Sequence, residues 1–240
     1  MSGHSKWNNI KRKKEKTDAA KAKIFTKIGK EMAVAIRAGG PNPDNNSKLR
    51  ELIAKAKANN VPNDNIDRAI KKFRDSDVVY EEITYEGYGP SGVAIIVETS
   101  TDNRNRTAGN VRAWFSKYGG NLGQNGCVSY LFEEKGVITI VDEDGEIDED
   151  KIMEDALECG AEDIRCDEGE YTIYTAPDDF DTVRDAIVSL GYTLDTADIA
   201  KVPSTYVDLD NPDDVENMEK MLEKFNEDDD VNAVYHNWNS

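Results

Sequence analysis

The sequence has few of the residues that build disulfide frameworks and metal centres. Its 240 residues include three cysteines and two histidines. The cysteines, at positions 127, 159 and 166, are odd in number and form no Cys-x-x-Cys pair, which fits reduced thiols better than a disulfide framework. The histidines stand at positions 4 and 236, near opposite ends. A zinc site of neighbouring histidines and cysteines is therefore not predicted.

Long apolar runs are missing as well. No stretch approaches the ~18 apolar residues of a membrane-spanning helix. The start of the chain lacks the apolar core of a secretory signal, because Lys6 and the cluster Lys11–Lys14 are followed by further lysines. We therefore expect a cytoplasmic protein with no membrane partner.

No constellation of catalytic residues can be recognised. Acidic residues abound, yet no spacing singles out a general acid and base, and two terminal histidines exclude an arguable Ser/His/Asp or Cys/His set. The acidic run Asp142–Asp148 superficially resembles a calcium loop but lacks its ligand order and terminal glutamate. We expect no enzyme activity, no cofactor and no bound metal.

Charge is what the chain has in excess, and it is unevenly distributed. The net charge is −18. Residues 1–74 hold 19 basic and 7 acidic side chains, net +12, whereas residues 75–240 hold 11 and 41, net −30. The sign reverses at Asp75-Ser76-Asp77, which we interpret as a linker. A basic end on an acidic chain indicates a polyanionic partner.

Residues 1–74 have helical periodicity. A first helix is predicted from Thr17 or Asp18 to Gly39-Gly40, a second from a cap at Ser47 to Asn59-Asn60, and a third from Asn63 or Asp64. Each has one apolar stripe, which predicts a small helical bundle behind a basic arm. The stripes contain Ile24, Phe25, Ile28, Met32, Ala35, Ile36, Leu49, Leu52, Ile53, Ala56, Ile66, Ala69, Ile70 and Phe73.

The arm and the first helix supply the candidate nucleic-acid contacts. Clustered lysines with almost no compensating acid repel one another unless phosphate neutralises them, and an aromatic among them can stack on a base. The alternatives are a solvated basic face and a tryptophan that packs back onto the bundle. The candidates are Lys6, Trp7, Lys11, Arg12, Lys13, Lys14, Lys16, Lys21, Lys23 and Lys27.

The remaining chain alternates strand and helix patterns. Strands are predicted at 83–85, 93–99, 128–132, 137–141, 163–165, 171–175, 194–203, 206–209 and 232–235, and helices at about 103–118, 149–159, 180–190 and 212–226. Residues 87–92 spell G-x-G-x-x-G, but a β-branched strand follows instead of a helix. We therefore interpret them as a hairpin turn and not as a dinucleotide site.

A second candidate contact precedes the helix that carries Trp114. Arg104, Asn105 and Arg106 lie at its start, with Asp102 as the expected N-cap, and the N-terminal N–H groups of a helix favour an anion. The alternative is that both arginines pair with nearby acids.

The order of elements predicts a multi-domain protein, a helical bundle followed by two α+β domains. Residues 1–76 form the bundle. Residues 134–204 read β-α-β-β-α-β, a ferredoxin-like domain, and are inserted in a discontinuous middle domain formed by residues 77–133 and 205–240. The insertion is inferred because residues 78–133 alone contain too few elements for a stable core.

A series of short motifs is spread over almost the whole chain: SGHSKW (2–7), NIKRK (9–13), Asp18-Ala19, KIF (23–25), Asn42-Pro43, Asn45, Ala54–Lys57, Asn59, Pro62, TYEG (84–87), TDNRNR (101–106) and GG-x-LG (119–123). In these motifs the chain resembles the YebC-type family of probable transcriptional regulators, which includes a mitochondrial translational activator of a cytochrome oxidase subunit.

This resemblance implies a three-domain regulator of gene expression. One function is DNA-binding transcription regulation; the other is ribosome-associated translation, with contact to RNA and relief of stalling. Both would place the basic part on phosphate. Bare nucleic acid would repel the acidic domains, so we expect them to contact a protein or the ribosome, or to hold the basic domain in a fixed pose. The sequence shows no recognition helix and no RNA-binding aromatic motif, so it leaves both open.

Overall fold

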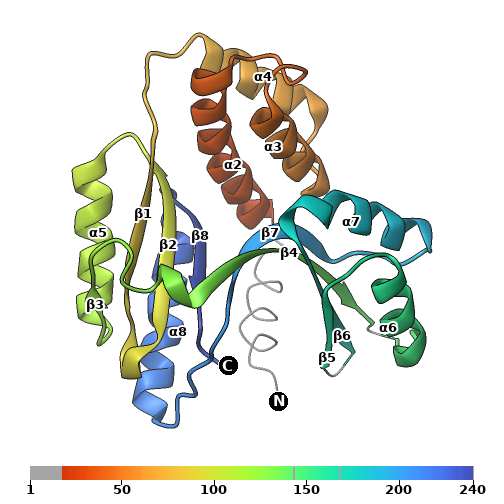
Figure 1. Cartoon of the computed structure of the whole chain (residues 1–240). Helices are drawn as coiled ribbons and strands as arrows, with labels where there is room; N and C mark the ends of the chain where they lie inside the picture. The colour runs from red at the N-terminus through yellow and green to blue at the C-terminus, as the bar shows by residue number, and fades with distance from the viewer. Residues whose placement is uncertain (1–17, 143, 168, 240) are drawn as a thin grey trace. The chain divides into compact units, whose positions relative to one another are not determined.

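The computed structural model describes residues 18–142, 144–167 and 169–239, and only the backbone of residues 18–21 (Figure 1). Helices and two four-stranded antiparallel sheets make it a mixed α and β fold, as predicted. Within the described part, no helix is long and apolar enough to cross a bilayer. The chain forms two compact units: the described residues up to Ser129 with Val207–His236, and Tyr130–Tyr206 with the last residues.

Three helices form the N-terminal part of the first unit, namely α2 (Asp18–Gly39), α3 (Ser47–Ala58) and α4 (Asn63–Arg74). Their buried side chains are those that the periodicity predicted, with Met32, Leu49 and Ala56 completely buried in one cluster. Ile24, Ile53, Ile70 and Phe73 pack against this cluster from its margin. The bundle is therefore held by one apolar stripe from each helix.

A buried asparagine joins the end of α2 to the start of α3. The Asn46 side-chain amide donates to the carbonyl groups of Ala35 and Gly40, both at 2.8 Å, and its Oδ1 accepts from the Leu49 N–H at 3.1 Å. The cap predicted at Ser47 is thus wrong by one residue. Asparagine both donates and accepts, so it can satisfy the end of one helix and the start of the next.

The first sheet has the order β3-β1-β2-β8. Its strands are β1 (Glu81–Tyr88), β2 (Ala94–Thr101), β3 (Asn121–Leu122) and β8 (Val231–His236). β1 and β2 form an antiparallel hairpin that pairs Tyr88 with Ala94. Its connection bends at Ser91 and Gly92, which have φ values of +50° and +82°. This confirms the hairpin interpretation of the glycine-rich motif.

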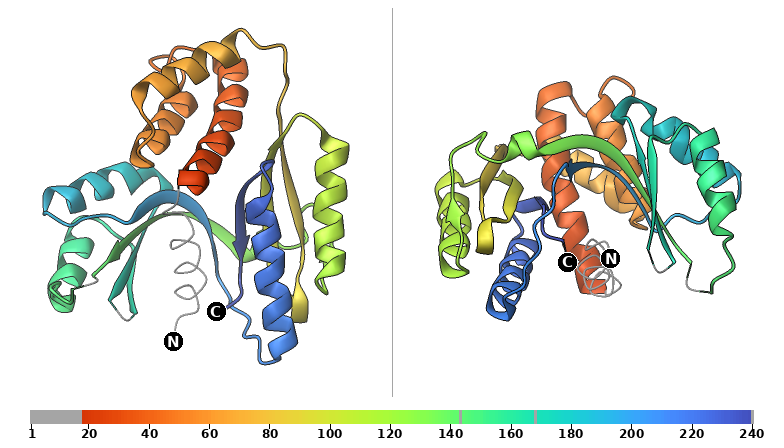
Figure 2. Two further views of the ribbon diagram at one scale, coloured as in Figure 1. Left: turned by 180° about the vertical axis from the view of Figure 1, so that it is seen from behind. Right: turned by 60° about the horizontal axis from the view of Figure 1, so that its bottom comes forward.

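Two helices, α5 (Arg104–Lys117) and α8 (Pro212–Glu227), cover one face of this sheet (Figures 1 and 2). Their contact is aromatic, since the rings of Phe115 and Phe225 have centroids 5.3 Å apart. A Cβ at Gly87 would lie 2.9 Å from the Phe115 ring. The first glycine of the motif therefore makes room for α5 and not for a phosphate.

A buried carboxylate holds the loop that follows β3. Glu86 is 6% exposed and accepts hydrogen bonds from the backbone N–H groups of Gly126 (2.8 Å), Val128 (2.9 Å) and Ser129 (2.9 Å). Burial raises the pKa of Glu86, but these hydrogen bonds outweigh it and leave the pKa below its ordinary value.

The second unit has the element order β-α-β-β-α-β. It consists of β4 (Phe132–Val141), α6 (Glu149–Glu158), β5 (Asp163–Asp167), β6 (Glu170–Thr175), α7 (Phe180–Ser189) and β7 (Thr196–Pro203). The sheet order is β5-β6-β4-β7 and all pairs are antiparallel. Ile138, Ile140 and Ile173 share a core with Ile152 of α6 and Ile187 of α7. Both helices therefore pack on one face of the sheet.

Two predicted strands are absent from the described residues. The strand predicted at 128–132 is a 3-10 turn over Ser129–Leu131, and β4 instead runs without a break from Phe132 to Val141. The strand predicted at 206–209 is irregular apart from one bridge residue at 207. Gly136 misled the first prediction: its backbone continues the ladder, and a Cβ there would lie 2.6 Å from the Phe180 ring.

Replacement of Asn46 tests the junction of α2 and α3. We expect Asn46→Ala to destabilise the bundle by about 1–3 kcal/mol, because it removes the cap and leaves buried carbonyl groups without donors. Asn46→Ser keeps a side-chain acceptor for the cap but loses the amide donors, so its loss should be intermediate if both roles matter. Hydrogen exchange of the α3 amides measures both variants. Wild-type protection in Asn46→Ala would contradict this role.

Candidate nucleic-acid interface

The predicted N-terminal contacts are described in part. Lys6, Trp7, Lys11, Arg12, Lys13, Lys14 and Lys16 lie outside the described residues, as does the side chain of Lys21. The structure places Lys23 and Lys27, together with Lys30, on α2. Their spacing of four and three residues aligns them along one side of the helix.

These three lysines contact the C-terminal end of α8 and the turn that follows it. Lys23 Nζ donates to the Glu227 carbonyl and lies 3.8 Å from Asp229 Oδ1. Lys27 Nζ donates to the Asn226 carbonyl at 3.0 Å. Lys30 Nζ donates to the Asp229 carbonyl at 2.9 Å. The last carbonyl groups of a helix lack partners within it and carry partial negative charge, which explains the preference for ammonium groups here.

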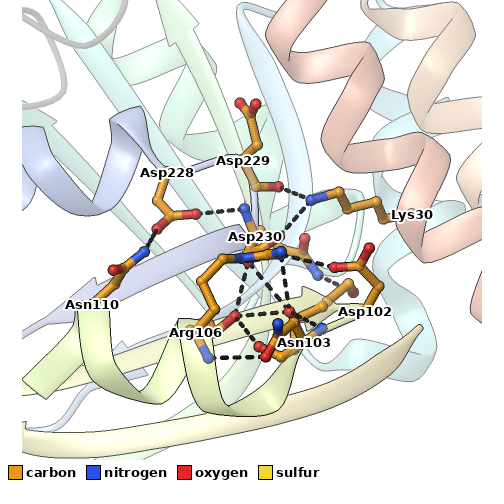
Figure 3. Close-up of polar contacts among 12 residues, drawn as sticks. Lys30, Asp102, Asn103, Arg106, Asn110, Asp228, Asp229 and Asp230 are labelled. Atoms are coloured by element: carbon orange, nitrogen blue, oxygen red, sulfur yellow. Dashed lines mark hydrogen bonds and ion pairs between the residues drawn. The ribbon is translucent and has the colours of Figure 1, made fainter. Parts of the chain in front are cut away.

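Asp230 continues this contact into the sheet (Figure 3). Its Oδ1 accepts from Lys30 Nζ at 2.6 Å, and its Oδ2 accepts from Arg106 Nη2 at 2.6 Å. The hydroxyl groups of Thr107 and Thr101 lie 2.8 and 3.2 Å from the same Oδ2. The Asp230 side chain is 5% exposed and that of Lys30 is 13% exposed. One buried carboxylate thus joins residues from α2, β2 and α5.

The electrostatics of Asp230 follow from this arrangement. Burial by itself raises the pKa of a carboxyl group, but the hydrogen bonds from Lys30, Arg106 and Thr107 outweigh it and hold the pKa of Asp230 at about 2. On the other side of the pair, hydrogen bonds to Asp230 and Asp102 raise the pKa of Arg106. The group is therefore charged throughout the physiological pH range.

The residues of the second predicted contact differ in their surroundings. Arg106 is paired within the fold, whereas Arg104 and Asn105 form an exposed site at the start of α5, named here the Arg104/Asn105 corner. Arg106 bonds to Asp230 and also to Asp102 at 2.8 Å, so its pairing with local acids is what the structure shows. Arg104 and Asn105 are exposed, and within the described residues Arg104 makes no ion pair. The N-cap is Asn103, which accepts from the Arg106 N–H at 3.1 Å, and not Asp102 as predicted.

Sequence reasoning missed Lys30 and Asp230 as members of this cluster. Lys30 is one of several lysines in the predicted first helix, and Asp230 closes an acidic run, Asp228-Asp229-Asp230, after a predicted helix. The only signal was this run of acids after a helix end. Nothing in the sequence indicates which of the many lysines would face it from 200 residues away.

Other basic side chains of the bundle are open to solvent. Lys57 of α3 and Lys71 and Lys72 of α4 are exposed, and among the described residues no carboxylate forms an ion pair with them. Lys72 lies over the ring of Phe73, with Nζ 5.5 Å from the ring centroid. No ion pair among the described residues would have to break for these lysines to meet a phosphate.

Nothing in the described part of the chain suggests a metal or redox site. No group of three potential ligands is placed to hold a metal ion there. The three cysteines are unpaired, and burial raises the pKa of each thiol, which lowers their reactivity.

Family models account for nearly all of the chain. Residues 5–76 match the model described as the TACO1/YebC protein N-terminal domain. Residues 80–238 match the model described as the TACO1/YebC second and third domain. Together with the basic helical part and the two sheets, these matches define the class of the protein. The chain belongs to the TACO1/YebC family.

Relatives and a solved structure agree with this assignment. The chain is 55% identical over 240 residues to a probable transcriptional regulatory protein of Agathobacter rectalis, covering 99% of both chains. It is 52% identical, with the same coverage, to one of Acetivibrio thermocellus. A conserved hypothetical protein of Aquifex aeolicus, 43% identical, has a TM-score of 0.80 over 92% of this chain and 91% of its own. The family is one of regulatory proteins and not of enzymes.

The depressed pKa of Asp230 predicts a specific pH dependence. A carboxyl group with a folded pKa near 2, against 3.8 ordinarily, contributes roughly 2 kcal/mol of stability above pH 4. This contribution is lost as the pH falls from about 4 towards about 2. We therefore expect Asp230→Asn to be about 2 kcal/mol less stable at pH 7, with the difference shrinking at pH 3.

Urea unfolding followed by tryptophan fluorescence at several pH values measures this difference. Asp102→Asn is the matched control, since Asp102 contacts the same arginine but is 43% exposed. An exposed pair should contribute less than about 1 kcal/mol. A pH-independent difference between wild type and Asp230→Asn would refute the assignment.

Proposed function

We propose that the protein regulates gene expression by binding nucleic acid through its basic N-terminal part, acting as a DNA-binding transcriptional regulator. The observation that carries this proposal is the separation of charge. Residues 1–74 have a net charge of +12, and the unit Tyr130–Tyr206, with 5 basic and 23 acidic side chains, has −18. A polyanion is attracted to one part and repelled by the other.

The proposed contacts are the arm residues from Lys6 to Lys16 with Lys21, supported by the exposed lysines of α3 and α4. Lys23 and Lys27 belong to the proposed set with a smaller share, because their ammonium groups already donate to α8. Arg104 and Asn105 form the second proposed contact, at the N-terminus of α5. Arg106 belongs to this contact with a smaller share, because its guanidinium group already forms an ion pair with Asp230.

The proposed organisation has three domains. The bundle is residues 1–76, residues 77–133 with 205–240 form a middle domain, and residues 134–204 form a ferredoxin-like domain inserted in it. The β-α-β-β-α-β order and the antiparallel sheet β5-β6-β4-β7 support the inserted domain. Its acidic surface would oppose bare nucleic acid, so we propose that it contacts protein. We place the protein in the cytoplasm.

A ribosome-associated translation factor is the alternative, because ribosomal RNA offers the same phosphate. Two measurements distinguish transcription regulation from a role on the ribosome. A footprint on one promoter, with discrimination beyond ~10³ over random DNA, supports transcription regulation. Co-sedimentation with ribosomes at physiological salt after DNase treatment supports translation and overturns the DNA assignment.

The salt dependence of binding tests the arm. On duplex DNA each neutralised phosphate contributes about −0.9 to the slope of log affinity against log salt. Replacement of Lys11, Arg12, Lys13 and Lys14 by alanine should flatten this slope by up to about 3.6 and weaken all sequences alike. Fluorescence anisotropy with a labelled mixed-sequence duplex over a salt series measures the slope.

Lys220→Ala with Lys224→Ala is the control. Both lysines are on α8 and are paired with Glu216 and Glu227. We expect this variant to keep the wild-type slope. If the arm variant binds with unchanged affinity and slope, the arm is not the contact.

A further inference from the structure

The two proposed contacts come from separate parts of the chain, and Asp230 lies between them. The bundle is joined to Asp230 through Lys30 of α2, and the Arg104/Asn105 corner is joined to it through Arg106 and Thr107 of α5. Figure 3 shows Lys30 and Arg106 pointing to Asp230 from different helices. The sequence alone does not show whether the two contacts bind one partner or two.

The backbone around Asp230 is fixed as well. The N–H of Ser100 in β2 donates to the Asp230 carbonyl at 2.8 Å, and the Asp230 N–H donates to Asp228 Oδ1 at 2.7 Å. Asn110 of α5 donates to the other oxygen of Asp228 at 3.2 Å. The carboxylate is therefore set in a turn that is itself bound to the sheet and to α5, and it cannot follow α2 if α2 moves away.

Separation of α2 from this turn would be costly. It would leave a nearly buried carboxylate with one cation instead of two, and would leave the α8 carbonyl groups without their lysine donors. Removal of one partner from a buried pair is far more costly than loss of an exposed pair. The described contacts therefore favour one arrangement of the bundle on the sheet.

We propose that Asp230 is a positioning residue that fixes α2 relative to the start of α5, an arrangement called here the frame. In this frame the bundle and the Arg104/Asn105 corner engage one polyanion at the same time. This inference rests on the proposed nucleic-acid binding. It gives Lys30 an internal role: its ammonium group serves Asp230 and does not contact phosphate.

Positioning and phosphate contact have different signatures. A lysine on a phosphate contributes to the salt slope, whereas a residue that only orders two contacts changes affinity and leaves the number of neutralised phosphates the same. Two contacts in a fixed frame bind more tightly than the same contacts on a loose connection, because the second meets its phosphate at high effective concentration. Loss of the frame should therefore lower affinity at constant slope.

The experiment uses two variants of opposite charge change, Lys30→Met and Asp230→Asn, in the full chain. The probes are a mixed-sequence DNA duplex and an RNA hairpin, each long enough to span both contacts. We expect both variants to bind about tenfold more weakly than wild type, with the salt slope unchanged. Simple charge effects predict opposite changes instead, with weaker binding for Lys30→Met and tighter binding for Asp230→Asn.

Lys220→Met and Glu216→Gln are the matched controls, since this exposed pair on α8 allows the same charge changes outside the cluster. Arg104→Ala tests the second contact itself. It should weaken binding in wild type and lower the salt slope by about 0.9, and unchanged binding would overturn the composite interface. A slope reduced by about 0.9 in Lys30→Met would overturn the positioning role, because Lys30 itself would then contact phosphate.

A distance measurement tests the frame without any nucleic acid. Spin labels at positions 67 on α4 and 117 on α5, in a background without the native cysteines, should give a narrow distance distribution in wild type and a broad one in Lys30→Met. A narrow distribution in the variant overturns the positioning role. If the frame loosens but wild type binds neither probe at low salt, the proposed function fails instead. Lys30→Met keeps the Arg106 pair, so it carries the test if Asp230→Asn does not fold.

Discussion

The ion pair of Asp230 with Lys30 and Arg106 is the constraint on which the arrangement of the first unit depends. Its carboxylate is taken out of water, a cost that only complete partnering offsets. The partners come from α2 and α5, and the neighbouring lysines of α2 satisfy the end of α8. Apolar packing holds the bundle and the sheet together internally. In the positioning role proposed above, the directional bonds to Asp230 add the constraint that fixes α2 relative to the sheet.

Much of the fold could be predicted because apolar periodicity is a local signal. The buried stripes of α2, α3 and α4 and most strands of the two sheets follow from it. The errors arose where local signals mislead. Glycine is depleted in strands, which favours a boundary at Gly136, but this glycine continues the ladder because the Phe180 ring leaves no room for a Cβ there. Residues 206–209 have strand-like composition but no ladder forms there, because composition does not provide a pairing partner.

The candidate site was less predictable, and the reason is the range of the interactions. A basic sequence indicates positive potential, but it does not show which cations are already used within the fold. Lys27 and Lys30 are about 200 residues from the groups that they contact. Arg106 and Arg104 are two residues apart and have opposite fates, since one faces Asp230 and the other faces solvent. Distinctions of this kind need tertiary structure.

The acidic unit Tyr130–Tyr206 has a consequence for kinetics. Its charge of −18 equals that of the whole chain, so the remaining residues sum to zero. Under the proposed function, a polyanion that approaches at low salt would therefore meet no net attraction to the chain as a whole. At physiological salt, screening over ~8 Å leaves only the charges nearest to the polyanion to act on it. The acidic unit would then disfavour binding to nucleic acid in most orientations.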